Sequence, residues 1–176
     1  MKEVFIKKNK SKTTQVTVCG ILISMALVLS YVERFLPLQI LIPLPGIKLG
    51  LANIVTLMAL FFLGESYAFT ILIIRCILGA VFGGGISALA FSLTGGLLAM
   101  SVMSIAKKNG KISVYGVSIL GAALHNVGQI LAAMVLMNSV YVIGYLPYLL
   151  VVSVFTGLAT GTICARVFRI LVASRW

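Results

Sequence analysis

The 176-residue sequence contains no aspartate, and its only acidic residues are Glu3, Glu33 and Glu65. It also has one histidine and three widely separated cysteines, none of them at metal-ligand spacing. This shortage argues against a zinc site, a disulfide scaffold and the cysteine- or histidine-rich ligand sets of iron–sulfur and haem proteins. We therefore expect neither a metal nor a cofactor.

Charged residues of all kinds make up only 10% of the chain, whereas a typical soluble domain has about 25%. Hydrophobic residues make up 61%, and the mean hydropathy is +1.16. They form long continuous runs rather than the alternating pattern of an outer-membrane barrel. The composition therefore predicts an all-α integral membrane protein and excludes a soluble enzyme and a disordered chain.

A helix needs about 20 apolar residues to cross a bilayer, and the apolar runs predict six transmembrane helices. The first run lacks a cleavage site, so we expect it to be retained rather than removed as a signal peptide. Residues 1–15 form a basic tail, residues 16–171 the transmembrane domain, and residues 172–176 a short basic end. The predicted spans are 16–36, 47–63, 67–82, 86–106, 113–137 and 141–171.

The net charge is +11, and the basic residues gather mainly in three clusters, at residues 7–12, 107–111 and 166–175. Each cluster flanks an apolar run, which points to the lipid bilayer rather than nucleic acid as the partner. With six spans, all three clusters fall on one side of the membrane. The positive-inside rule makes that side the cytoplasm. We therefore expect a multi-pass plasma-membrane protein with both termini in the cytoplasm.

Arg75 lies near the middle of the third predicted span, where a charge is costly and usually faces the bundle interior. One interpretation is a structural pair with Glu33 or Glu65. The other is contact with an anionic group of a ligand. Both glutamates are expected near opposite ends of the bundle, so neither is an obvious partner.

The fifth predicted span carries a polar group formed by His125, Asn126 and Gln129, which lie within one helical turn of each other. Such a group can line a pocket, or it can make hydrogen bonds between helices. A role for His125 as a catalytic base is not expected, because the sequence offers no carboxylate partner for it.

The segment 43–53 reads P-L-P-G-I-K-L-G-L-A-N and leads into the second span. Lys48 stands beside a helix N-terminus, a natural anion site, although it can equally snorkel to the interface. Asn53 would extend a polar lining inward. The predicted substrate-binding residues are Lys48, Asn53, Arg75, His125, Asn126 and Gln129.

The wording P-G-I-K-L-G-L-A-N-I-V-T-L resembles the family called heptaprenyl diphosphate synthase component I, also known as the Gx transporter family, over about residues 16–170. That family is similar to the substrate-binding S components of energy-coupling factor transporters. The resemblance implies a six-helix bundle that binds a small molecule in its outer half and carries no ATP site. It also implies a lid between the first two helices, formed by Leu36, Pro37, Pro43, Pro45 and Gly46.

By the same resemblance, helix one would dock to a transmembrane coupling subunit through small side chains. Small residues recur four positions apart in several spans, and such rows serve either packing within a bundle or docking between subunits. S components often carry Ala-x-x-x-Ala in helix one, whereas this chain has Gly20 and Ser24, and Ala26 and Ser30, at that spacing. The predicted docking residues are Gly20, Ser24, Ala26 and Ser30.

Catalysis is not expected, because prenyl diphosphate synthases resemble one another in aspartate-rich magnesium motifs and this chain has no aspartate. We expect the substrate-binding subunit of an uptake transporter, partnered by a coupling subunit with ATPases. Its ligand would be vitamin-like, quinone-related or isoprenoid-related, with an anionic group. The alternatives are a non-catalytic partner of a soluble prenyl diphosphate synthase in heptaprenyl diphosphate or menaquinone synthesis, and a subunit of a membrane redox complex. The transporter interpretation requires the polar side chains to meet at a cavity.

Overall fold

The computed structural model describes residues 12–35 and 50–173, and every element within these two ranges is helical. The prediction of an all-α protein is therefore confirmed. The elements in chain order are α1 (Lys12–Val32), the 3-10 turn η2 (Glu33–Phe35), α3 (Asn53–Phe62), α4 (Glu65–Gly79), the π-type turn η3 (Ala80–Gly84), α5 (Gly85–Lys108), α6 (Val114–Leu136), the 3-10 turn η4 (Val140–Tyr145) and α7 (Leu146–Ala173).

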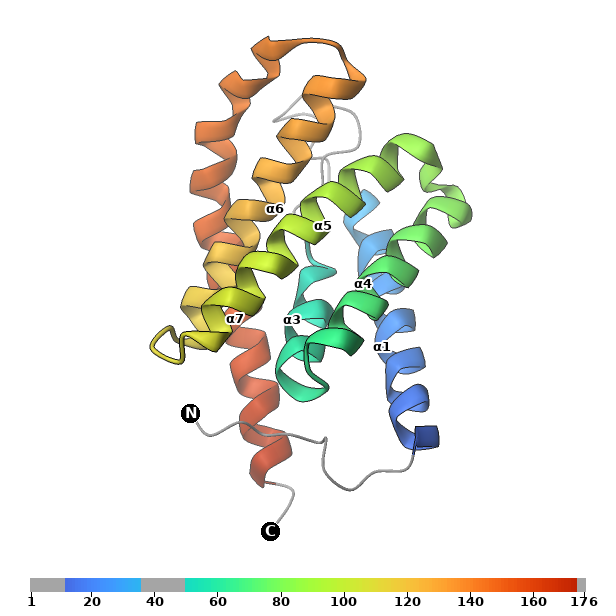
Figure 1. Ribbon diagram of the computed structural model, residues 1–176, viewed down its shortest axis with the longest axis vertical. Helices are drawn as coiled ribbons and strands as arrows, with labels where there is room; N and C mark the ends of the chain where they lie inside the picture. The colour runs from blue at the N-terminus through green and yellow to red at the C-terminus, as the bar shows by residue number, and fades with distance from the viewer. Residues whose placement is uncertain (1–11, 36–49, 174–176) are drawn as a thin grey trace.

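Four helical segments within the described residues are long and apolar enough to cross a membrane: Lys12–Val32, Glu65–Lys108, Val114–Leu136 and Val140–Ile170. The second spans 44 residues but folds back on itself at η3, where Phe82 and Gly83 leave the helical conformation. Gly83 has φ +99° and Gly85 has φ +70°, values that glycine adopts without steric cost. The predicted break at the triple glycine therefore turns α4 and α5 into a hairpin (Figure 1).

The count of six crossings stays a prediction because of α3, which has only 10 residues. At a rise of 1.5 Å per residue it is about 15 Å long, half the thickness of a hydrocarbon core of about 30 Å. The predicted second span was 47–63, and its first residues lie outside the described part of the chain.

The short helix α3 is the centre of the fold, in contact with α1, α4, α5, α6 and α7. Seven of its ten residues are buried. By contrast, α1 is the most peripheral long helix, since Leu22 and Ala26 are its only buried residues. The N-terminus of α3 therefore lies inside the bundle, where it can hold a polar group among packed helices.

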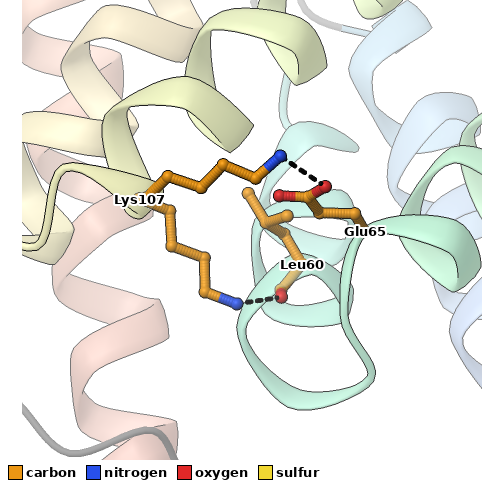
Figure 2. Close-up of polar contacts among 4 residues, drawn as sticks. Leu60, Glu65 and Lys107 are labelled. Atoms are coloured by element: carbon orange, nitrogen blue, oxygen red, sulfur yellow. Dashed lines mark hydrogen bonds and ion pairs between the residues drawn. The ribbon is translucent and has the colours of Figure 1, made fainter.

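The opposite end of α3 is fixed by a lysine from another helix. Lys107, near the end of α5, donates a hydrogen bond from Nζ to the carbonyl oxygen of Leu60 at 3.0 Å (Figure 2). The last carbonyls of a helix lack partners within it, so this contact satisfies one of them. Next to it, Lys108 forms an exposed ion pair with Glu65 at 3.1 Å, which contributes little to stability because water screens it.

The described basic side chains other than Arg75 are found where α1 begins and where α5 and α7 end. Figure 1 places these three helix ends at the lower end of the molecule, opposite η3 and η4. The described members of the three basic clusters thus lie at one end of the bundle. The residues are Lys12, Lys107, Lys108, Lys111, Arg166 and Arg169.

Helices α5 and α6 cross at a contact between two glycines. A Cβ at Gly128 would lie 2.6 Å from the Cα of Gly95, a distance that no real side chain tolerates. In addition, Thr94 donates from Oγ1 to the carbonyl oxygen of Gly128 at 3.1 Å. At this crossing the backbones of α5 and α6 are in direct contact, which fixes the position of the α6 polar residues along the bundle.

Helix α7 packs on α6 through the row of small residues that it shares with the predicted sixth span. A Cβ at Gly157 would lie 2.6 Å from the Cα of Ile119, and one at Gly161 would lie 3.1 Å from the Cα of Tyr115. A hydrogen bond between Ser118 and Thr160 at 2.5 Å adds to the seam. For this row, the choice between internal packing and subunit docking is decided in favour of packing.

Candidate functional site

A buried carboxylate stands at the start of α3. Glu33, in the turn η2 after α1, accepts hydrogen bonds from the backbone N–H groups of Gly50 at 2.5 Å and Leu51 at 3.4 Å. The Glu33 side chain is only 3% exposed. A ligand anion was expected at this end of α3. Among the described residues, the carboxylate of Glu33 supplies that negative charge instead.

Gly50 lies where the turn η2, the start of α3 and the middle of α6 come together. Its φ is +83°, and an added Cβ would lie 2.8 Å from Nδ2 of Asn53 and 3.1 Å from Cδ2 of His125. Both the conformation and the space therefore require glycine. Gly50 thus lies between Asn53, the first residue of α3, and His125 in the middle of α6.

Arg75 joins the same group from α4. Its Nη2 donates to Oδ1 of Asn53 at 3.1 Å, and the side chain is 6% exposed. The charge of Glu33 also acts on Arg75. Of the two glutamates, Glu33 thus acts on Arg75 because the turn after α1 folds back over the start of α3, whereas Glu65 pairs with Lys108.

The polar residues of α6 face two directions. His125 and Gln129 share a hydrogen bond between their Nε2 atoms at 3.1 Å, and His125 faces Gly50 and Gly95 of α5. Asn126 instead donates from Nδ2 to the carbonyl oxygen of Leu149 on α7 at 2.9 Å. Of the two roles predicted for these polar residues, lining a pocket or bonding between helices, Asn126 therefore has the second.

We call Glu33, Gly50, Asn53, Arg75, His125 and Gln129 the central polar cluster. It brings together four of the six predicted substrate-binding residues. Of the other two, Asn126 faces α7, and Lys48 lies outside the described residues, as does the whole predicted lid (Leu36, Pro37, Pro43, Pro45 and Gly46).

Nε of Arg75 and Oε1 of Gln129 are buried atoms of the central polar cluster that have no hydrogen-bond partner within the described residues. A buried polar atom without a partner costs roughly 1–3 kcal/mol. Because nearly all such atoms in folded proteins are satisfied, a water or a ligand is the expected partner of each.

A small cavity lies beside the cluster, between α3, α5, α6 and α7. Its volume is about 10 Å³, enough for one water molecule and far below the roughly 300 Å³ of a typical ligand pocket. The described conformation is therefore a closed one. The lining residues are Gly50, Asn53, Leu57, Met103, Ser118, Gly121, Ala122, Thr156 and Thr160.

Glu33 was predicted only as a possible partner of Arg75, and no role was predicted for Gly50. One signal could have found Glu33: it is the sole acidic residue in the first predicted span, 16–36. The hydroxyl side chains of α7 that line the cavity gave no such signal, because threonine is common in membrane helices.

The four predicted docking residues of α1 do not share one face. Gly20 and Ser24 are exposed and line a shallow groove along the outer side of α1. Ala26 is fully buried in the core, and Ser30 is half-buried. Ala26 and Ser30 therefore lie outside the outward-facing groove that Gly20 and Ser24 line.

Within residues 12–35 and 50–173, no group of three or more histidine, cysteine, aspartate or glutamate side chains is placed to hold a metal ion.

These features define a helical, multi-pass membrane protein with a polar cluster at its centre. The family model for heptaprenyl diphosphate synthase component I matches residues 22–167. The chain therefore belongs to the heptaprenyl diphosphate synthase component I family. No curated protein and no solved structure gives a significant match.

Proposed function

We propose that this protein is a non-catalytic membrane subunit that binds a small molecule at the central polar cluster. The observation that carries the proposal is a pair of unsatisfied buried atoms, Nε of Arg75 and Oε1 of Gln129, in a part of the bundle that is otherwise apolar. Polar groups at membrane depth are costly and usually functional. The S-component-like bundle suggested by the sequence motif fits such a role in small-molecule uptake.

Because the cavity holds only one water, binding requires the helices around Asn53 to separate. Helix α1 is the candidate for the moving part, since it has the fewest buried residues of the long helices. The outward groove at Gly20 and Ser24 would then serve a transmembrane coupling subunit, where small side chains allow close helix contact.

Native mass spectrometry of protein purified in mild detergent tests this proposal. We expect a retained small molecule on the wild-type protein and its loss from Gln129→Ala. Asn109→Ala, in the polar loop at the other end of α5, is the matched control and should retain the molecule. Equal retention by both variants would place the ligand elsewhere.

The proposed topology gives a second prediction. With Cys19, Cys76 and Cys164 replaced by serine, a new cysteine at Lys111 should react with a membrane-impermeant maleimide only after the cells are opened. A cysteine at Tyr141, whose side chain is 93% exposed at the other end, should react in intact cells. The reverse pattern would place the basic end outside the cell.

The family match favours a second function, as a membrane partner of a soluble synthase that makes heptaprenyl diphosphate. In that case the protein should co-purify with an aspartate-rich soluble subunit. By itself it should not extend prenyl diphosphates, because no aspartate is available to hold magnesium. Magnesium-dependent chain extension by the purified protein alone would contradict both proposals.

A further inference from the structure

The central polar cluster contains one buried cation and one buried anion. Arg75 is 6% exposed and Glu33 is 3% exposed, and they are linked through Asn53 and Gly50 by hydrogen bonds of 3.1 Å and less. Two backbone N–H groups donate to the Glu33 carboxylate, and bonds of this kind favour the ionised form. The two charges therefore balance inside the bundle.

The third titratable member of the cluster is His125. The atom that approaches Nε2 of His125 is Nε2 of Gln129, an amide nitrogen that can only donate. Where Nε2 of His125 accepts this bond, the proton is on Nδ1 and the ring is neutral. With a neutral His125, the charges of the described residues of the cluster sum to zero.

The two unsatisfied atoms differ in kind. Nε–H of Arg75 is a donor and needs an acceptor, whereas Oε1 of Gln129 is an acceptor and needs a donor. A ligand that satisfies both must present both kinds of group. A simple carboxylate offers only acceptors.

We propose that Glu33 is the fixed counter-charge of Arg75, and that the central polar cluster binds a molecule of zero net charge with both an acceptor and a donor, such as an amide or an alcohol. This inference rests on the proposed function and specifies its ligand. It departs from the expectation of an anionic ligand, which considered Arg75 without its partner. An anion would leave an unbalanced negative charge in a low-dielectric interior, where the cost is high.

The test uses the full-length protein in lipid nanodiscs and an extract of small molecules from the producing cells. Anion exchange splits the extract into an unretained fraction and an anionic fraction. The melting temperature of the protein is then measured with each fraction. The unretained fraction should raise the melting temperature of the wild-type protein by about 5 °C, and the anionic fraction should leave it unchanged.

Glu33→Gln should reverse this preference, because Arg75 loses its counter-charge and then recruits an anion. The matched control is Glu65→Gln, which removes the other described carboxylate from an exposed ion pair and should behave like the wild type. The double variant Glu33→Gln with Arg75→Gln should no longer favour the anionic fraction.

The possible outcomes distinguish the inference of a neutral ligand from the proposed binding function. Stabilisation of the wild type by the anionic fraction alone would overturn the inference and leave the binding function intact. No stabilisation by either fraction would overturn both. If Glu33→Gln does not fold, the wild-type preference between the two fractions still decides the question.

Discussion

Gly128→Leu should prevent the stable folding of this protein. The new Cβ would meet the Cα of Gly95 at 2.6 Å and the carbonyl oxygen of Thr94 at 2.8 Å, and both are backbone atoms of α5 that cannot turn aside. Overpacking of this kind costs about 3 kcal/mol or more. We expect a loss of monodisperse protein in size-exclusion chromatography and a much lower melting temperature for any that remains.

The control for this prediction is Gly20→Leu on the outer side of α1, where nothing lies within 4 Å of an added Cβ. Leucine also favours a helix over glycine by roughly 0.8 kcal/mol, so this variant should be as stable as the wild type. If Gly128→Leu melts within a few degrees of Gly20→Leu, the α5–α6 crossing at this glycine pair is not as described.

Arg75→Met should destabilise the protein by about 3 kcal/mol, because it leaves the Glu33 carboxylate buried without its counter-charge. The change keeps the side chain long and removes its charge, so the loss reflects charge rather than volume. Thermal unfolding in detergent, followed by circular dichroism, measures the effect.

Arg166→Met is the matched control, since Arg166 is exposed near the end of α7; its effect should stay within about 0.5 kcal/mol. Adding Glu33→Gln to Arg75→Met should restore part of the lost stability, because it removes the unbalanced charge. An equal loss in both single variants, or no recovery in the double variant, would mean that Glu33 and Arg75 are not paired.

Most of the helices could be predicted from the sequence because apolar runs separated by glycine, proline and charge leave few alternatives. The predicted span 113–137 corresponds to α6 (Val114–Leu136), and the predicted span 86–106 to α5 (Gly85–Lys108). The break at Gly83 was predicted for the same reason. The short central helix α3 was not foreseen as the hub of the fold, because hydropathy reports how apolar a helix is and not what surrounds it.

The site was harder to predict because its members meet across long separations in the chain. The spacing of His125 and Gln129 on one helix was readable, and their hydrogen bond follows from it. By contrast, the contact between Glu33 and Gly50 depends on how the turn after α1 folds back. The direction of Asn126 toward α7 depends on which helix packs beside α6, which spacing alone does not give.

The most direct test of the central claim is a high-resolution density map of the protein purified without added ligand. The account predicts non-protein density within hydrogen-bond distance of Nε of Arg75 and Oε1 of Gln129, with the Glu33 carboxylate still at the start of α3. A cluster in which water alone satisfies both atoms, in a bundle that stays closed, would contradict a binding function at this site.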